Sequence, residues 1–181
     1  MSNKDVQDKD FNLTNLIFRP VTEADLPALE WDGEYKKYRR MYANLYQDYL
    51  AGKTLLWLVE LPHGEIIGQT FILLNGGDKD TADGSHRAYL FALRVKRHYQ
   101  NLGVGSRLLQ FVENDLRRLG FSIITLNVAK ENINALRLYQ RQGYQITGPR
   151  SGIWSYLDHE GDLQHVNESA WRMEKRFSEQ D

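Results

Sequence analysis

The chain has 181 residues, with 23 basic and 24 acidic side chains, a net charge of −1 and no cysteine. This length suits one domain with a sizeable core, and the balanced charge gives no overall attraction to nucleic acid or to an anionic membrane. The absence of cysteine excludes disulfides, thiolate catalysis and cysteine-ligated zinc, and it is compatible with a reducing cytoplasm, where we expect the protein to act.

The first ten residues are polar and charged, and they read as a disordered tail with no targeting function. We expect a single domain over residues 11–178. No run of about eighteen apolar residues occurs, so the sequence predicts no membrane span. The five histidines are scattered without helical pairing, so we expect no metal site.

The first half of the domain predicts two helices and three strands. A short strand over residues 16–20 precedes a helix opened by Thr22, with Asp25 in an approximate capping box. Tyrosines at three- and four-residue steps predict a second helix from Glu34 to Ala51. Residues 54–61 and 66–74 are rich in β-branched and aromatic side chains and predict an antiparallel hairpin.

The second half predicts a buried strand, a helix, a strand and a helix in succession. After a polar surface loop over residues 75–87, the strand at 88–95 is almost continuously apolar. A helix from Val104 to Gly120, a strand over 121–128 and a helix from Asn132 to Gln142 follow. Residues 154–159 and 170–177 predict a last hairpin that finishes the sheet. The expected class is α/β (α+β) with one mixed sheet.

Two glycines stand one residue apart at the start of the Val104 helix. Exposed amide groups at a helix N-terminus favour an anion, and glycine lets a phosphate approach closely. A P-loop is excluded because Gly105 is followed by Ser106 and Arg107. A dinucleotide-binding turn fits poorly, because Leu108 replaces its third glycine. A tight turn with no ligand remains the alternative.

Two motifs occur in order. Gln100, Gly103 and Gly105 fit Gln/Arg-x-x-Gly-x-Gly/Ala after a strand that ends Leu-Arg-Val, and residues 132–144 fit Asn-x-x-Ala-x-x-Leu-Tyr-x-x-x-Gly-Phe/Tyr. The chain therefore closely resembles the GNAT superfamily of N-acetyltransferases over residues 18–177. The resemblance implies a mostly antiparallel sheet of six to seven strands, flanked by about four helices, with two splayed central parallel strands.

The resemblance also implies an activity and a set of site residues. Acetyl-CoA would be the co-substrate, and its acetyl group would pass directly to a primary amine of a small molecule or a peptide. Tyr139 would act as the general acid or as a hydrogen-bond donor to the sulfur. The implied coenzyme-binding residues are Leu93, Arg94, Val95, Gln100, Asn101, Leu102, Gly103, Val104, Gly105, Ser106 and Asn132.

The general base and the acceptor are less defined. Many family members carry a glutamate near the start of the first splayed strand, where this chain has Tyr89, so we expect an amine of low pKa or a water-relayed base. Glu30, Asp32 and His86 are distant candidates for that base. Aromatic and carboxylate side chains on the early helices and the last hairpin suit a cationic amine. The candidate acceptor residues are Glu30, Trp31, Asp32, Tyr35, Tyr89 and Trp154.

Other assignments stay open. The acceptor could be a protein N-terminus or a lysine, or the domain could be a catalytically silent sensor that binds acyl-CoA. A homodimer is also compatible with the resemblance. Tyr139 favours an enzyme, whereas the missing glutamate favours the sensor.

Overall fold

The computed structural model describes residues 11–76 and 78–177, so the predicted tail lies outside the described residues. Its main sheet has seven strands in the order β1-β2-β3-β4-β5-β9-β6, in which β4 and β5 are the parallel pair. A separate two-stranded sheet is formed by β7 and β8. The strands are β1 (Ile17–Pro20), β2 (Thr54–Glu60), β3 (Ile66–Leu73), β4 (Arg87–Val95), β5 (Ile123–Ala129), β6 (Gln145–Arg150), β7 (Ile153–Leu157), β8 (Leu163–Asn167) and β9 (Ala170–Arg176).

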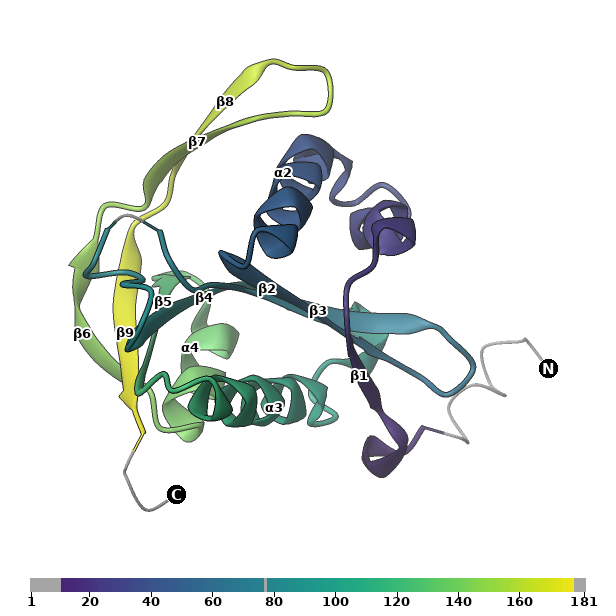
Figure 1. Ribbon diagram of the computed structural model, residues 1–181, viewed down its shortest axis with the longest axis horizontal. Helices are drawn as coiled ribbons and strands as arrows, with labels where there is room; N and C mark the ends of the chain where they lie inside the picture. Colours follow the sequence, from purple (N-terminus) through teal and green to yellow (C-terminus); the bar gives the residue numbers. More distant parts are fainter. Residues whose placement is uncertain (1–10, 77, 178–181) are drawn as a thin grey trace.

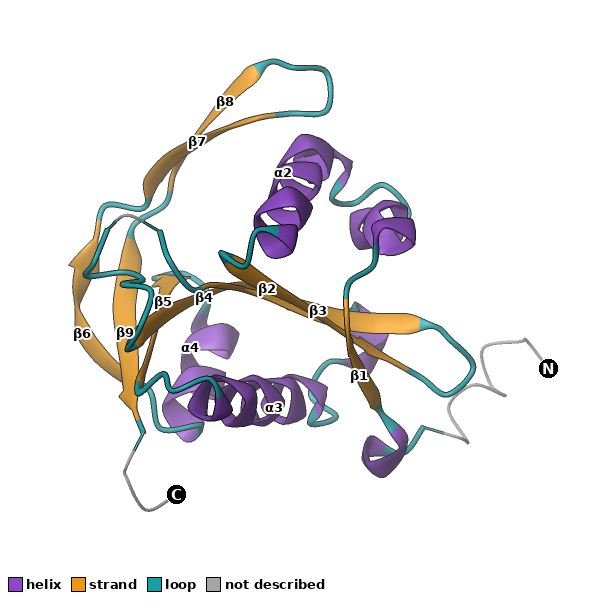
Figure 2. Cartoon of the chain, in the orientation of Figure 1, coloured by secondary structure: helices purple, strands orange, loops and turns teal. Residues whose placement is uncertain are grey.

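Helices cover both faces of the main sheet. Figure 1 shows α2 on one face and α3 and α4 on the other, and Figure 2 shows that the β7–β8 hairpin reaches out on the α2 side. No helix in the described residues is long and apolar enough to cross a membrane. The helices are η1 (Leu13–Asn15), η2 (Glu23–Glu30), η3 (Lys36–Tyr38), α2 (Arg39–Leu50), η4 (Arg97–Tyr99), α3 (Val104–Arg118) and α4 (Ile133–Arg141).

The apolar periodicity of α3 produces the larger of two hydrophobic clusters. Leu108, Leu109, Val112 and Leu116 are completely buried against the sheet, and each such side chain contributes roughly 1.5–3 kcal/mol of burial free energy. The smaller cluster lies between α2 and the opposite face, around Tyr42. The mixed α/β fold predicted from the sequence is confirmed.

The two N-terminal helices differ from their predictions. The capping box is confirmed, since the Thr22 amide donates to the Asp25 carboxylate at 2.8 Å, but the helix it opens is a 3-10 helix that contains Pro27. The predicted helix from Glu34 begins as an α-helix only at Arg39. The reason is local, because Trp31, Asp32 and Gly33 all take positive φ and the chain turns before the helix starts.

The predicted C-terminal hairpin was wrong in its pairing. β7 pairs with β8, which the sequence analysis missed, while β9 lies inside the main sheet between β5 and β6. β6 was also missed, because it contains Gly148 and Pro149, which are unusual in strands. Its place at the edge of the sheet explains why a proline is tolerated there.

The loop between β3 and β4 packs onto the sheet, although the sequence predicted a free surface loop. The carbonyl of Asp80 accepts a hydrogen bond from Arg172, and that of Thr81 accepts one from the Thr125 hydroxyl at 3.0 Å. Ala82 is completely buried. These contacts fix the loop beside β5 and β9.

A β-bulge in β4 changes the direction of the side chains that follow it. Gln69 of β3 faces Arg94, and Phe71 faces Phe91, so a two-residue step in β3 corresponds to three residues in β4. Ala92 takes φ of 53° at this point, a left-handed conformation that costs about 1 kcal/mol for a residue with a side chain. As a result, Arg94 and Phe91 both lie on the α2 face.

Gly152 sets the base of the β7–β8 hairpin, and its replacement by alanine is expected to destabilise the protein by about 1–3 kcal/mol. Its φ is 63°, and an added Cβ would lie 1.5 Å from the Glu168 carbonyl oxygen. Thermal unfolding should show a Tm several degrees lower. Gly148→Ala is the matched control, because nothing lies within 4 Å of its added Cβ. An unchanged Tm for Gly152→Ala would contradict the prediction.

Candidate active site

The parallel strands β4 and β5 separate part-way along their length. They pair from Arg87 with Ile123 to Leu90 with Leu126 and no further. Beyond this point β4 stays paired with β3, and β5 stays paired with β9 as far as Ala129. The sheet therefore has a gap between two strands that are each held on their outer side, as the predicted splay requires.

The end of β4 presents backbone groups to this gap. The Lys96 amide donates to β3 at Ile67, at 2.8 Å, and backbone hydrogen bonds alternate in direction along a strand. The amide and carbonyl of Val95 therefore face the gap. The Gln100 side chain donates to that carbonyl at 2.9 Å, so this predicted coenzyme residue also holds the strand end.

The glycine turn leaves a series of amides without partners. Asn101 and Gly103 take positive φ, of 62° and 90°, and α3 begins at the next residue, Val104. In the described chain, the amides from Asn101 to Ser106 donate no backbone hydrogen bond. Together with the dipole of a fifteen-residue helix, they form a site suited to an anion.

A cavity of about 490 Å³ joins the strand end, the glycine turn and α4. None of the described residues that line it is acidic. Nine of the eleven predicted coenzyme residues line this cavity. The two that do not are Leu102, whose side chain is exposed, and Val104, which is buried in the core. Its lining residues are Tyr35, Leu93, Arg94, Val95, Gln100, Asn101, Gly103, Gly105, Ser106, Asn132, Asn134, Ala135, Leu138 and Arg141.

Helix α4 contributes residues that the sequence analysis did not assign to the site. Asn134, Leu138 and Arg141 recur at steps of four and three, so they share one face of the helix. That spacing could have identified them. Asn132 caps the helix, and its side-chain oxygen accepts from the Ala135 amide at 3.2 Å, which leaves its NH₂ group for a ligand.

Tyr139 lies on the buried face of α4 and is 7% exposed. Its ring packs edge-on against Tyr144 at 5.7 Å. Burial raises the pKa of the Tyr139 phenol well above its usual value, and the nearby Tyr89 phenol raises it further. In the described residues its hydroxyl makes no hydrogen bond, and Tyr139 is not among the residues that line the large cavity.

The family model for the acetyltransferase (GNAT) family matches residues 20–144, more than half of the chain. This chain belongs to the GNAT family. The match includes the gap between β4 and β5, the glycine turn and Tyr139. The resemblance predicted from the two sequence motifs is thereby confirmed.

Two curated relatives illustrate the range of GNAT sequences similar to this one. A probable spermine N(1)-acetyltransferase of Bacillus subtilis subsp. natto is 33% identical over 87 residues, which is 47% of this chain and 56% of that protein. Probable N-acetyltransferase 14 of Xenopus tropicalis is 28% identical over 113 residues, 62% of this chain and 50% of that protein. The chain thus spans about half the length of these relatives.

Solved GNAT structures share the fold at lower identity. A GNAT family acetyltransferase from Streptococcus pneumoniae has a TM-score of 0.65 and 21% identity, with coverage of 90% of this chain and 99% of that one. A GNAT family acetyltransferase from Elizabethkingia anophelis, solved with acetyl-CoA bound, has a TM-score of 0.61 and 20% identity, with the same coverage. That neighbour shows that the fold accommodates acetyl-CoA.

The predicted acceptor residues of this GNAT domain lie in different parts of the structure. Tyr35 lines the large cavity. Tyr89 stacks on Phe91 at 5.8 Å, and Trp154 stacks on Tyr38 at 6.3 Å. Tyr38 was not predicted for the site, although its spacing from Tyr35 and Tyr42 places it on the same helical face.

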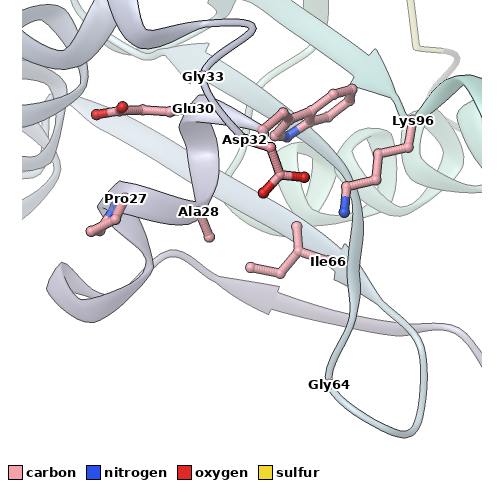
Figure 3. Close-up of a pocket in the computed structure, with 9 residues that line it drawn as sticks. Pro27, Ala28, Glu30, Asp32, Gly33, Gly64, Ile66 and Lys96 are labelled. Carbon is pink, nitrogen blue, oxygen red and sulfur yellow. The ribbon is translucent and has the colours of Figure 1, made fainter.

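The remaining three acceptor candidates line a second cavity of about 360 Å³, between the segment after η2 and the β2–β3 turn. Figure 3 shows the Asp32 carboxylate and the Lys96 ammonium group turned toward the same space above Ile66, while the Glu30 carboxylate points away. Unlike the large cavity, this one does not include the glycine turn. Its lining residues are Pro27, Ala28, Glu30, Trp31, Asp32, Gly33, Gly64, Ile66 and Lys96.

Two of the base candidates are engaged elsewhere. Glu30 accepts two hydrogen bonds from Arg39, at 2.6 and 2.9 Å, which lower the pKa of its carboxyl. His86 precedes β4, at the opposite end of the strand from Val95, and its Nδ1 lies 2.8 Å from the Ser85 hydroxyl. In the described residues, no group of three or more histidines and acids could hold a metal ion.

Proposed function

We propose that this GNAT domain is an acetyl-CoA-dependent N-acetyltransferase that acetylates a primary amine of low pKa. The observation that carries the proposal is the gap between β4 and β5, which opens beside a row of unpaired amides at the start of α3. Backbone groups at the gap suit the extended arm of the coenzyme, and the amides suit its diphosphate. The acetyl-CoA bound to a structural neighbour supports this assignment.

The residues of the cavity fit the coenzyme in charge and in space. The cavity has no acidic lining residue, and Arg141 adds a positive charge from α4. At Gly105 an added Cβ would lie 3.3 Å from Leu138, so glycine keeps the wall between α3 and α4 open. Bound acetyl-CoA would supply the acetyl group as a thioester.

Tyr139 is the residue we assign to the leaving sulfur. A thiol has an ordinary pKa of about 8.5, and that of the buried phenol is raised above about 10. Full proton transfer from Tyr139 would therefore be unfavourable. Tyr139 instead keeps its proton and donates a hydrogen bond to the sulfur as negative charge develops there.

The amine has to arrive largely neutral, because the strongest candidates for a protein base are occupied or remote. Glu30 is paired with Arg39 and His86 lies at the far end of β4, and Tyr89 is a phenol whose pKa is raised by burial. An α-amine with a pKa of about 7.7 is roughly one-sixth neutral at pH 7, whereas a lysine amine is neutral in less than about one molecule in a thousand. We therefore favour an α-amine as the acceptor.

Coenzyme binding and turnover test the proposal separately. Acetyl-CoA at about 100 times its dissociation constant should raise the Tm by roughly 5–10 °C, and NADH, a dinucleotide control, should not. Thiol release from acetyl-CoA should then depend on an added amine. A stabilised protein that releases no thiol with any α-amine, lysine peptide or polyamine would contradict the enzyme and indicate a coenzyme sensor.

A further inference from the structure

Arg94 occupies the aromatic cluster on the α2 face of the sheet. Its guanidinium carbon lies 4.1 Å from the ring centre of Tyr35 and 5.3 Å from that of Tyr38. Its Nη1 donates to the Tyr42 hydroxyl at 2.9 Å. The ring face of Tyr35, which the sequence analysis assigned to a cationic amine, therefore already holds a cation of the protein.

Among the described residues, the charge of Arg94 has no counter-ion. None of the ion pairs within residues 11–76 and 78–177 includes it. The guanidinium is half-buried and lines the large cavity, next to Val95 and the gap. A cation in such a place, stacked on aromatic rings, interacts strongly with an anion that displaces water.

Gln69 supplies a second, independent observation at the same place. It lies directly opposite Arg94 in the antiparallel register, so the two side chains share a face. It is completely buried beside the Tyr42 hydroxyl, yet in the described chain neither atom of its amide has a hydrogen-bond partner of ordinary geometry. Buried amides are normally satisfied, so this one points to a missing polar group or a water at the Arg94 site.

A second arginine continues the positive character of this face. Arg172 is 4% exposed and lies 5.7 Å from the ring of Tyr89. It contacts the Asp80 carbonyl and the Asn127 side chain, and within the described residues it forms no ion pair. A polycationic acceptor would meet the like charges of Arg94 and Arg172.

We propose that the acceptor carries a carboxylate and that Arg94 binds it, with the primary amine directed into the gap. This inference rests on the proposed function, because it names the chemistry of the acceptor in the same site. The planar guanidinium holds a carboxylate through two parallel hydrogen bonds, and Tyr35 and Tyr38 fix its orientation. The acceptor class is therefore an amino acid or a similar amine with a nearby carboxylate.

Matched acceptors test the proposal. The value of kcat/KM for thiol release is measured for L-amino acids, for their α-carboxamides and for spermidine, with the wild type, Arg94→Met and Arg94→Lys. Each variant is compared with the wild type on the same acceptor, so differences in amine pKa cancel. We expect the loss of kcat/KM caused by Arg94→Met to be about 10- to 100-fold larger for the amino acids than for their carboxamides. Arg94→Lys should lie between.

Controls separate this result from a folding defect. Arg176→Met removes a largely exposed arginine on β9 and should leave both acceptor classes unchanged. The shift in Tm caused by acetyl-CoA shows whether each variant retains the coenzyme site. If Arg94→Met does not fold, Arg94→Lys is compared with the wild type instead, because lysine keeps the positive charge but cannot form the two parallel hydrogen bonds to a carboxylate.

A binding measurement separates failure of this inference from failure of the proposed function. Tryptophan and tyrosine fluorescence of the CoA-loaded protein is titrated with an amino acid and with its carboxamide. If the wild type binds the amino acid more tightly than its carboxamide, and Arg94→Met loses this difference, the carboxylate site is supported. This holds even without thiol release, and the absence of thiol release would then contradict only the acetyltransferase assignment. Equal binding of the pair, equal losses in both classes, or a preference for spermidine that Arg94→Met leaves intact would overturn the inference.

Discussion

Replacing Tyr139 with phenylalanine is expected to lower kcat about 100-fold or more while leaving the fold and coenzyme binding intact. The hydroxyl makes no hydrogen bond in the described residues, so its removal costs little folding energy. The ring itself stays packed against Tyr144. The loss therefore falls on the leaving sulfur, and steady-state thiol release measures it.

Tyr144→Phe is the matched control for this experiment. It removes a hydroxyl from the neighbouring ring, which is fully buried and has no partner of ordinary geometry in the described chain. We expect kcat to stay within about threefold, since this hydroxyl lies beside Glu113 and has no part in the proposed transfer. Tyr139→Phe with full turnover on the physiological acceptor would remove Tyr139 from the mechanism.

The direction of the Tyr139 pKa shift adds a pH dependence to the same prediction. A raised pKa means that the phenol keeps its proton to higher pH than a free tyrosine. The wild-type kcat should therefore show no alkaline decline from this group below about pH 10. A fall near pH 8 that is absent in Tyr139→Phe would show that the phenol ionises in the active state, contrary to its burial.

Lys175→Met is expected to lower the free energy of unfolding by about 3 kcal/mol. The Lys175 ammonium group lies 2.7 Å from the Glu113 carboxylate, whose side chain is only 4% exposed. The variant would leave this carboxylate buried without its partner, and an uncompensated buried charge is strongly destabilising. Urea unfolding, followed by circular dichroism, measures the change.

A double replacement identifies the cause. Glu113→Leu combined with Lys175→Met removes both charges and should recover most of the lost stability. Lys53→Met is the control, since its pair with Asp48 is exposed and 3.7 Å apart, and we expect it to change stability by less than about 0.5 kcal/mol. A Lys175→Met variant as stable as the wild type would mean that another group, such as the Tyr144 hydroxyl, satisfies the carboxylate.

The central part of the fold was predictable because its patterns are local. The apolar period of α3, the continuous apolar run of β4 and the glycines at Gly103 and Gly105 each determine one element. The gap between β4 and β5 followed from family resemblance. The pairing of the C-terminal strands could not be predicted, because tertiary contacts and not a local pattern decide that β9 joins the main sheet while β7 pairs with β8.

The candidate coenzyme residues were easier to predict than the acceptor residues. Ten of the eleven predicted coenzyme residues lie between Leu93 and Ser106, and nine of the eleven line one cavity. The predicted acceptor residues come from the end of η2 and the segment that follows it, from β4 and from β7, and the sequence did not show that Arg94 would stack on Tyr35. The positive φ values at Trp31 and Asp32 also moved these side chains to a second cavity. No local pattern marked either outcome.

The bulge at Ala92 makes the backbone conformation of one residue a determinant of the acceptor chemistry we propose. Arg94 lies three residues after Phe91 and still shares its face. Without the bulge, a strand of the same length would follow ordinary alternation, and the arginine would turn toward the apolar layer under α3 while Leu93 took its place. A substitution that straightened the bulge would thus remove the proposed carboxylate ligand from the acceptor site, with every side chain of that site still present in the sequence.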